Sequence, residues 1–225
     1  QILEINQLGL EDLNNQETIS IIASDNLVNG SLVAIPGNIS SSNGYQASIS
    51  TNIQVGYVGS DDPLGPDEYG YYIYDESDTD YQWAPVYDWI EIDPDYGGDG
   101  DQLSIYDNGN NLDDSAVFDL PFTFTFYGQD YNEITICSNG WIALGATDMT
   151  SFRNYNLPGA GGPAPMIAVF WDDLKTTNGG EIYWYYNSVE DYLVIEWSNL
   201  RTYTDNDVET FQAILYNSSS STPTG

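Results

Sequence analysis

Residues 119–145 read DLPFTFTFYGQDYNEITICSNGWIALG, and this stretch determines which fold the rest of the chain has to complete. Aromatic and β-branched residues alternate with polar ones in FTFTFYG and in EITIC, which is the period of a strand with one buried face. The dipeptides Tyr127-Gly128 and Asn139-Gly140 are typical of turns. The pattern favours antiparallel strands and gives no sign of helix.

The same pattern extends over residues 83–225, which predict an antiparallel β-sandwich with very little helix. Apolar or alternating runs are separated there by GG, NG and PG turn signals, and IYWYYNSVEDYLVIEW, residues 182–197, predicts a hairpin. The predicted strands are residues 88–93, 102–107, 116–128, 133–145, 164–174, 180–187, 192–200 and 209–217.

The N-terminal part of the chain differs from this sandwich. Residues 1–58 hold shorter β-type runs between Asn-, Gly- and Ser-rich turns, and they predict an incomplete Ig-like β-sandwich whose first strands are missing. Residues 59–82 mix prolines, glycines, acids and tyrosines, and predict an acidic linker or lead-in strand. The predicted fold class is therefore all-β, an Ig-like piece followed by a larger antiparallel sandwich. The abrupt first and last residues lead us to expect part of a longer polypeptide.

The charge balance restricts the partners of the protein. The chain of 225 residues has 35 Asp and Glu against 3 Lys and Arg, a net charge of −32. Nucleic acids and anionic membrane surfaces would be repelled by this charge. Only Arg153, Lys175 and Arg201 can pair with a carboxylate, so the other acids must be solvated, protonated or bound to cations.

The acids are concentrated where a calcium ion could use them, because 18 of the 35 lie in residues 61–119. Calcium prefers six to eight oxygen ligands, and glycines allow the tight turns that gather them. DPDYGGDGD and DNGNNLDDS supply both, although a solvated acidic loop or a metal-free turn explains them as well. A third segment, DESDTD at residues 75–80, is a weaker candidate. The predicted Ca²⁺ ligands are Asp93, Asp95, Asp99, Asp101, Asp107, Asn108, Asn110, Asp113 and Asp114.

The sequence argues against an enzyme. The chain has no histidine, which excludes Ser-His-Asp and Cys-His devices and the common zinc sites. The single cysteine, Cys137, lies in an alternating run and is expected to be a buried core thiol. Asp172 and Asp173 could suggest a glycosidase pair, but adjacent strand residues point to opposite faces. No apolar run approaches the roughly 20 residues that span a bilayer.

Three segments together carry a family resemblance: residues 119–145, the loop and strand NYNLPGAGGPAPMIAVFWDDL, and the hairpin GEIYWYYNSVEDYLVIEWSNL. Their order resembles a β module of large secreted bacterial surface proteins and of gingipain-like or subtilisin-like peptidases exported by type IX secretion. It is similar, more distantly, to the extracellular nidogen-type domain. The resemblance covers roughly residues 55–216 and implies an accessory β domain in a secreted or cell-surface protein, without catalytic residues of its own.

These observations predict a non-catalytic extracellular structural or adhesive module that calcium stabilises. Its expected partners are other protein chains, either further copies in a surface layer or filament completed by strand exchange, or cell-surface proteins. Two alternatives stay open. One is an accessory domain of a secreted peptidase. The other is a carbohydrate-binding module that holds glycans on exposed aromatic side chains.

Overall fold

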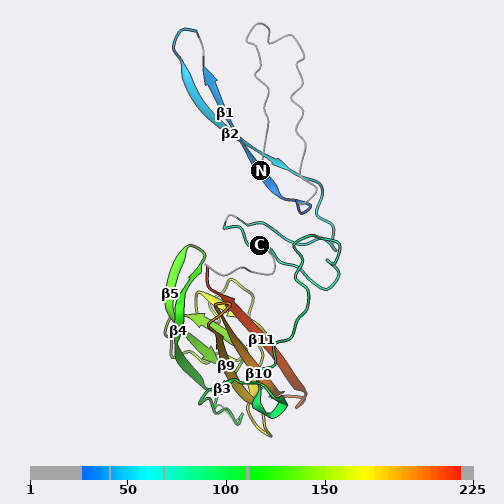
Figure 1. The fold of residues 1–225 in the computed structure, drawn as a ribbon, viewed down its shortest axis with the longest axis vertical. Helices are drawn as coiled ribbons and strands as arrows, with labels where there is room; N and C mark the ends of the chain where they lie inside the picture. Colours follow the sequence, from blue (N-terminus) through cyan, green and yellow to red (C-terminus); the bar gives the residue numbers. More distant parts are fainter. Residues whose placement is uncertain (1–26, 41, 68, 110–111, 219–225) are drawn as a thin grey trace. The chain divides into compact units, whose positions relative to one another are not determined.

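The computed structural model describes residues 27–40, 42–67, 69–109 and 112–218. The chain divides into two compact units with the boundary between Val86 and Tyr87, and Figure 1 colours both along the sequence. Among the described residues the regular structure is almost all antiparallel β, and the 3-10 turn η1 (Pro94–Tyr96) is the only helical element. The predicted all-β class is confirmed.

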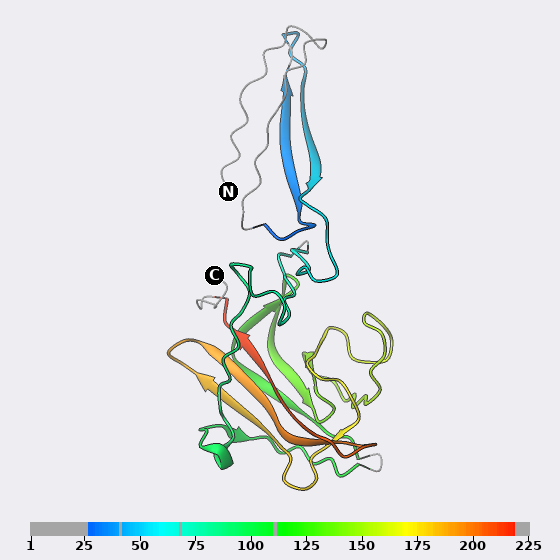
Figure 2. The same cartoon turned by 90° about the vertical axis from the view of Figure 1, so that its right-hand side faces the viewer.

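Among the described residues of the first unit, β1 (Leu32–Ser40) and β2 (Gln46–Gln54) form a β-hairpin, drawn in blue to cyan in Figure 2. Its register pairs Val33 with Ile53 and Gly37 with Ile49 on one face. The other face mixes polar pairs such as Asn38 and Ser48 with Leu32, Ala34 and Pro36. Residues 1–26 lie outside the described residues, so an Ig-like sandwich in residues 1–58 stays a prediction.

The segment predicted as a linker, residues 59–82, belongs to this first unit and has defined local structure. Leu64 and Ile73 form an isolated antiparallel bridge. The carboxylate of Asp67 accepts hydrogen bonds from the backbone N–H groups of Tyr69 and Tyr71, at 2.9 and 3.0 Å. In this segment Asp67 therefore forms a turn through its side chain.

The second unit is a sandwich of two antiparallel sheets (Figure 2). The first sheet has the order β11-β10-β9-β3, and β8 also pairs with β10. Its strands are β3 (Asp101–Gln102), β8 (Leu174–Lys175), β9 (Glu181–Asn187), β10 (Tyr192–Thr202) and β11 (Val208–Tyr216). The second sheet has the order β4-β5-β6-β7. Its strands are β4 (Ser115–Phe126), β5 (Gln129–Cys137), β6 (Trp141–Leu144) and β7 (Met166–Ala168).

The core lies between the inner faces of these two sheets. Ile134 and Ile136 of β5 meet Leu193 and Ile195 of β10 in one buried cluster, together with Trp197. Burying an aliphatic side chain of this size contributes roughly 1.5–3 kcal/mol relative to leaving it exposed. The predicted sandwich and the predicted β9–β10 hairpin are both confirmed.

Three predicted strands are wrong in extent: residues 88–93, 102–107 and 164–174. The last of these is strand only at β7 and at Leu174 of β8, so Asp172 and Asp173 do not lie in a strand. Residues 88–93 form no ladder. Ile90 O accepts a bond from the Gln212 amide, and Ile92 N–H donates to Glu196. The carbonyls of Ile92 and Asp93 accept bonds from N–H groups of the loop that follows, residues 96–100. Ile92 instead packs on the outer face of β10 against Val194. Of residues 102–107, only Gln102 lies in a strand, the two-residue β3. Because residues 88–93 cover its outer face, β10 is buried on both faces, and its sequence is a nearly continuous apolar run.

The register of β4 against β5 shifts between Asp119 and Phe124. Pro121 lies within this interval and has no N–H to give to the ladder. The core-facing residues of β4 alternate without interruption through the proline, whereas those of β5 change from Ile134 to Tyr131 across the shift.

The predicted strand 133–145 is in fact two strands, β5 and β6, joined by the turn Ser138-Asn139-Gly140. Gly140 has a φ of +74°, a conformation that costs other residues energy. Its carbonyl accepts bonds from the N–H groups of Val169 and Phe170, at 3.1 and 3.0 Å. A Cβ on Gly140 would lie 1.9 Å from the Phe170 carbonyl oxygen, so only glycine fits.

Replacing Gly140 by alanine should therefore destabilise the protein by about 3 kcal/mol, through left-handed strain and overpacking together. Gly145 is the matched control, because its φ is +94° but no atom lies within 4 Å of the position that a Cβ would take there. Gly145→Ala should cost only about 1 kcal/mol. Urea unfolding followed by tryptophan fluorescence measures both, and equal losses would contradict the close-approach argument.

Candidate functional site

The first predicted calcium segment, residues 93–101, holds one buried and three exposed aspartates. Asp93 is buried and caps η1, where its Oδ1 accepts a bond from Asp95 N–H at 2.8 Å. Its Oδ2 accepts a bond from the Ser198 hydroxyl on β10 at 2.6 Å. Asp95, Asp99 and Asp101 are exposed. Protein donors thus satisfy the one buried carboxylate of this segment.

The second segment is built around a buried hydrogen bond between Asp107 and Ser138. Asp107 is 2% exposed and Ser138 is fully buried. The Ser138 hydroxyl donates to Asp107 Oδ2 at 2.7 Å, while Asp107 Oδ1 accepts from Gly109 N–H at 2.8 Å. The Asp107 backbone N–H donates to the Thr176 hydroxyl at 2.9 Å, and Thr176 N–H donates back to the Asp107 carbonyl at 2.7 Å.

Asn139, the next residue of the turn, connects a further acid to the first sheet. Its amide donates to Asp113 Oδ1 at 2.9 Å, and its side-chain oxygen accepts from Leu174 N–H on β8 at 2.9 Å. Asp114 accepts bonds from Tyr106 and Ser115 N–H groups at 2.8 and 2.9 Å. Of the predicted amide ligands, Asn108 is exposed, and Asn110 lies outside the described residues.

The acids around this turn affect one another electrostatically. Burial raises the pKa of Asp107, and the charges of Asp113 and Asp114 raise it further, while bonds from Ser138 and Gly109 lower it. Burial likewise raises the pKa of Asp173, with contributions from Asp113 and Asp107 and an opposing one from Lys175. Asp107, Asp113, Asp114 and Asp173 thus form an acidic cluster around Ser138. The sequence did not indicate that Asp173 belongs to it, because Asp173 lies 59 positions after Asp114.

Metal binding at the predicted residues stays a prediction. Within residues 27–40, 42–67, 69–109 and 112–218, no three His, Cys, Asp or Glu side chains are grouped so that they could hold a metal ion. The buried carboxylate of Asp93 and the carboxylates near Ser138 accept protein hydrogen bonds. A cation there would have to use backbone, amide or water oxygens for most of its ligands.

The single thiol has the inert environment that the sequence predicted. Cys137 is fully buried, and burial raises its pKa to about 12. The Cys137 carbonyl accepts a bond from the Trp197 indole of β10 at 2.8 Å, so this residue helps to join the two sheets. A thiol with so high a pKa is not a nucleophile at neutral pH.

Glu196 is a buried acid that the sequence analysis missed. It lies on β10 in the apolar run YLVIEW, is 1% exposed, and accepts a bond from the Gln212 amide at 2.9 Å. Burial raises its pKa to about 7, and the neighbouring charges of Glu91 and Asp93 add to this shift. The signal in the sequence was a lone acid among core residues.

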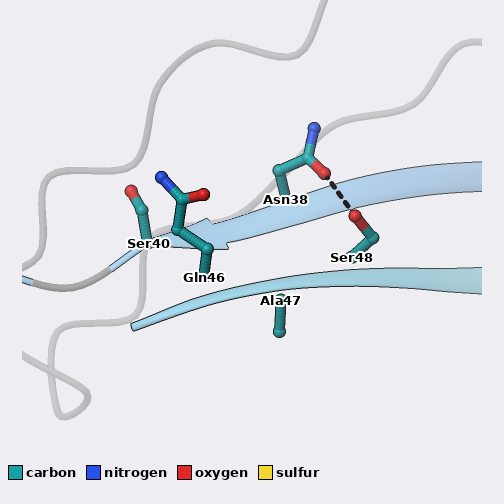
Figure 3. A pocket seen from close by; sticks show the side chains of 5 residues that line it. All are labelled: Asn38, Ser40, Gln46, Ala47 and Ser48. Atoms are coloured by element: carbon teal, nitrogen blue, oxygen red, sulfur yellow. Dashed lines mark hydrogen bonds between the residues drawn. The ribbon is translucent and has the colours of Figure 1, made fainter. Parts of the chain in front are cut away.

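The hairpin of the first unit carries a shallow polar pocket. Its lining residues are Asn38, Ser40, Gln46, Ala47 and Ser48. Figure 3 shows Asn38 and Ser48 joined by a hydrogen bond on one face, with Ala47 on the other. The lining side chains are uncharged, and their amides and hydroxyls can donate and accept hydrogen bonds.

Together these features define a class, an antiparallel β-sandwich module held by buried polar turns. A model of the NIDO-related family matches residues 98–221, more than half of the chain, so the protein belongs to the NIDO-related family. The distant resemblance to the extracellular nidogen-type domain is confirmed at this level. The link to secreted bacterial peptidases stays a prediction.

A relative from Caenorhabditis elegans, "Dendrite extension defective protein 1", is 31% identical over 106 residues. The aligned part covers 46% of this chain but only 9% of that protein. No solved structure is significantly similar to the chain. No helix among the described residues is long and apolar enough to cross a membrane.

The raised pKa of Glu196 predicts a pH dependence of stability. Its folded-state pKa of about 7 exceeds the ordinary 4.5, so the folded state binds the proton more tightly. Protonated Glu196 therefore contributes about 3 kcal/mol to the free energy of unfolding. This contribution is fully present below pH 4.5 and is lost as the pH rises through about 7. Glu196→Gln should remove this loss, so the variant gains on the wild type between pH 4.5 and 8.

The free energy of unfolding is measured for Glu196→Gln and for the wild type at several pH values. The difference between the two proteins at each pH removes the contributions of the other acids, which both share. Glu91→Gln is the companion variant, because removing that charge should reduce the pH dependence without abolishing it. A pH-independent difference between Glu196→Gln and the wild type would contradict the prediction.

Proposed function

We propose that this protein is a non-catalytic extracellular module with a structural or adhesive role, and that it acts by contacting other protein chains. The observation that carries the proposal is the match to the NIDO-related family over residues 98–221. The absence of histidine from the sequence and the buried, high-pKa thiol of Cys137 support a role without catalysis. Both predicted alternatives, a peptidase accessory domain and a glycan-binding module, remain open.

The hairpin of the first unit is the surface best suited to protein contact. Residues 26–60 contain no Asp, Glu, Lys or Arg in a chain with a net charge of −32. Two copies that approach through this segment bring no carboxylates together, whereas other acidic surfaces repel one another. Ile49 is 53% exposed and Ile53 is 39% exposed on the apolar face.

The physical state of the hairpin also favours a partner. Among the described residues, neither β1 nor β2 pairs with a third strand. A two-stranded hairpin is marginally stable in water, and unpaired strand edges accept further strands. Proteins usually protect such edges with charged residues, and β1 and β2 have none. We therefore favour a second copy of this chain as the partner, joined by strand addition as in a filament or surface layer.

A charge on the apolar face should prevent this self-association. Ile49→Asp places a carboxylate on that face, and Ser50→Asp places the same charge on the opposite face. The wild type and Ser50→Asp should sediment as assemblies that persist on dilution, whereas Ile49→Asp should sediment as a monomer. Analytical ultracentrifugation over a hundredfold dilution measures this. A monomeric wild type would reject the filament role.

Calcium stabilisation is the second part of the proposal, and the excess of carboxylates supports it. If calcium binds only the folded state at about 100 times its Kd, it adds about 2.7 kcal/mol, or roughly 5–10 °C in Tm. Excess chelator should lower Tm by this amount, and calcium but not magnesium should restore it.

The same thermal measurement on Asp99→Asn and Asp113→Asn tests the first and the second predicted segment separately. A variant that removes a true ligand should lose the chelator response. A wild-type Tm that chelator does not change would mean that the acids are solvated and that calcium has no structural role.

A further inference from the structure

The buried polar atoms that lack a hydrogen-bond partner point to the third acidic segment, DESDTD at residues 75–80, which from the sequence was only a weaker calcium candidate. Among the described residues there are three: Tyr74 Oη, Asp78 Oδ1 and Arg201 Nε. Two of them belong to one short loop of the first unit. Asp78 is 3% exposed, so its free carboxylate oxygen is withheld from bulk water as well as from protein donors.

The backbone holds Asp78 at the junction of two turns. Asp78 N–H donates to the Asp75 carbonyl, and Tyr81 N–H donates to the Asp78 carbonyl, both at 3.1 Å. Asp78 Oδ2 accepts a bond from Asp75 N–H at 2.7 Å. Asp75 is occupied elsewhere, because its Oδ1 accepts bonds from the Ser77 backbone and hydroxyl at 2.8 and 2.6 Å. One oxygen of Asp78 is therefore fixed by the turn and the other is left over.

The charge of Asp78 acts on the phenols around it. Burial raises the pKa of Tyr74, and the neighbouring Tyr72 and Asp78 raise it further. A hydrogen bond to Asp62 raises the pKa of Tyr81 to about 12, with a smaller contribution from Asp78. Both phenols therefore remain protonated and neutral at neutral pH, and they bring no positive charge to this carboxylate.

No side chain of the first unit can supply the missing positive charge. The three basic residues of the chain are Arg153, Lys175 and Arg201, and all lie in the second unit, after residue 86. Buried charges in proteins are paired with an opposite charge or coordinate a metal. A buried polar atom without a partner otherwise indicates an ordered water or ion.

We propose that the loop at residues 74–78 binds a hydrated calcium ion through Asp78 Oδ1, with the Tyr74 hydroxyl as a second oxygen on the ion or on one of its waters. Hard oxygen donors suit Ca²⁺, and its flexible coordination accepts one carboxylate and several waters more readily than Mg²⁺ does. Since calcium affinity falls with the number of charged ligands, a site with a single carboxylate should bind no more tightly than the weak extracellular modules, whose Kd is on the order of 10⁻⁴–10⁻³ M.

This inference rests on the proposed calcium stabilisation only for the choice of ion. It uses none of the ligands predicted at residues 93–114, so the two can fail separately. Asp113→Asn reports on the acidic cluster around Ser138, whereas Asp78→Asn reports on this loop.

The test uses terbium, which replaces Ca²⁺ at oxygen sites and emits when a nearby tyrosine or tryptophan absorbs light. The intact chain is titrated with Tb³⁺ and then with Ca²⁺ as competitor at about 0.15 M salt, which screens diffuse attraction. Asp78→Asn should weaken competition by Ca²⁺ at least tenfold. Asp80→Asn, an exposed acid of the same loop, should change it less than twofold.

Tyr74→Phe is the second variant, because it keeps the ring and removes only the unpartnered hydroxyl. It should also weaken Ca²⁺ competition, by several-fold, while far-UV circular dichroism stays unchanged. Equal effects of Asp78→Asn and Asp80→Asn would overturn the site in favour of diffuse attraction. Unchanged Ca²⁺ competition in both Asp78→Asn and Tyr74→Phe would mean that a water alone fills the position.

Discussion

The hydrogen bond from the Ser138 hydroxyl to the Asp107 carboxylate, 2.7 Å long and fully buried, is the interaction on which the sandwich depends. Ser138 begins the turn between β5 and β6 in one sheet, and Asp107 is bonded through its backbone to Thr176, next to β8 of the other. Asn139 adds a bond to Leu174 N–H, and the Trp197 indole adds one to the Cys137 carbonyl. Residues 137–139 thus give the two sheets a fixed relative position, which apolar packing alone specifies poorly.

This arrangement also explains how a chain with net charge −32 can bury carboxylates at all. Asp93 and Asp107 are each held by one serine hydroxyl and one turn N–H, and Glu196 by an amide and a backbone N–H. Hydrogen bonds to charged groups contribute about 1.5–3 kcal/mol, enough to offset part of the desolvation cost. Neutral donors replace the missing lysines and arginines, while Asp78 keeps one oxygen for which the described protein atoms offer no donor.

Much of the sandwich could be predicted from alternation and turn residues, as at residues 182–197, where strand and turn signals are local. The sequence could not show that residues 88–93 cover a sheet face without pairing, because their bonds go to Gln212 and Glu196, more than 100 positions away. The candidate calcium residues were chosen by composition, which cannot distinguish a carboxylate that accepts protein hydrogen bonds from one that is free. The sequence did not show that Asp173 and Glu196 have raised pKa values, because only the tertiary fold buries them and brings them near other acids.

A double-mutant cycle between Asp107 and Ser138 tests the central claim most directly. The free energy of unfolding is measured for the wild type, Asp107→Ala, Ser138→Ala and the double variant at pH 7. If the buried bond joins the sheets as described, the second substitution should cost about 2 kcal/mol less when the first partner is already absent. Effects that add to within about 0.3 kcal/mol would show that the two residues act independently and would contradict this account.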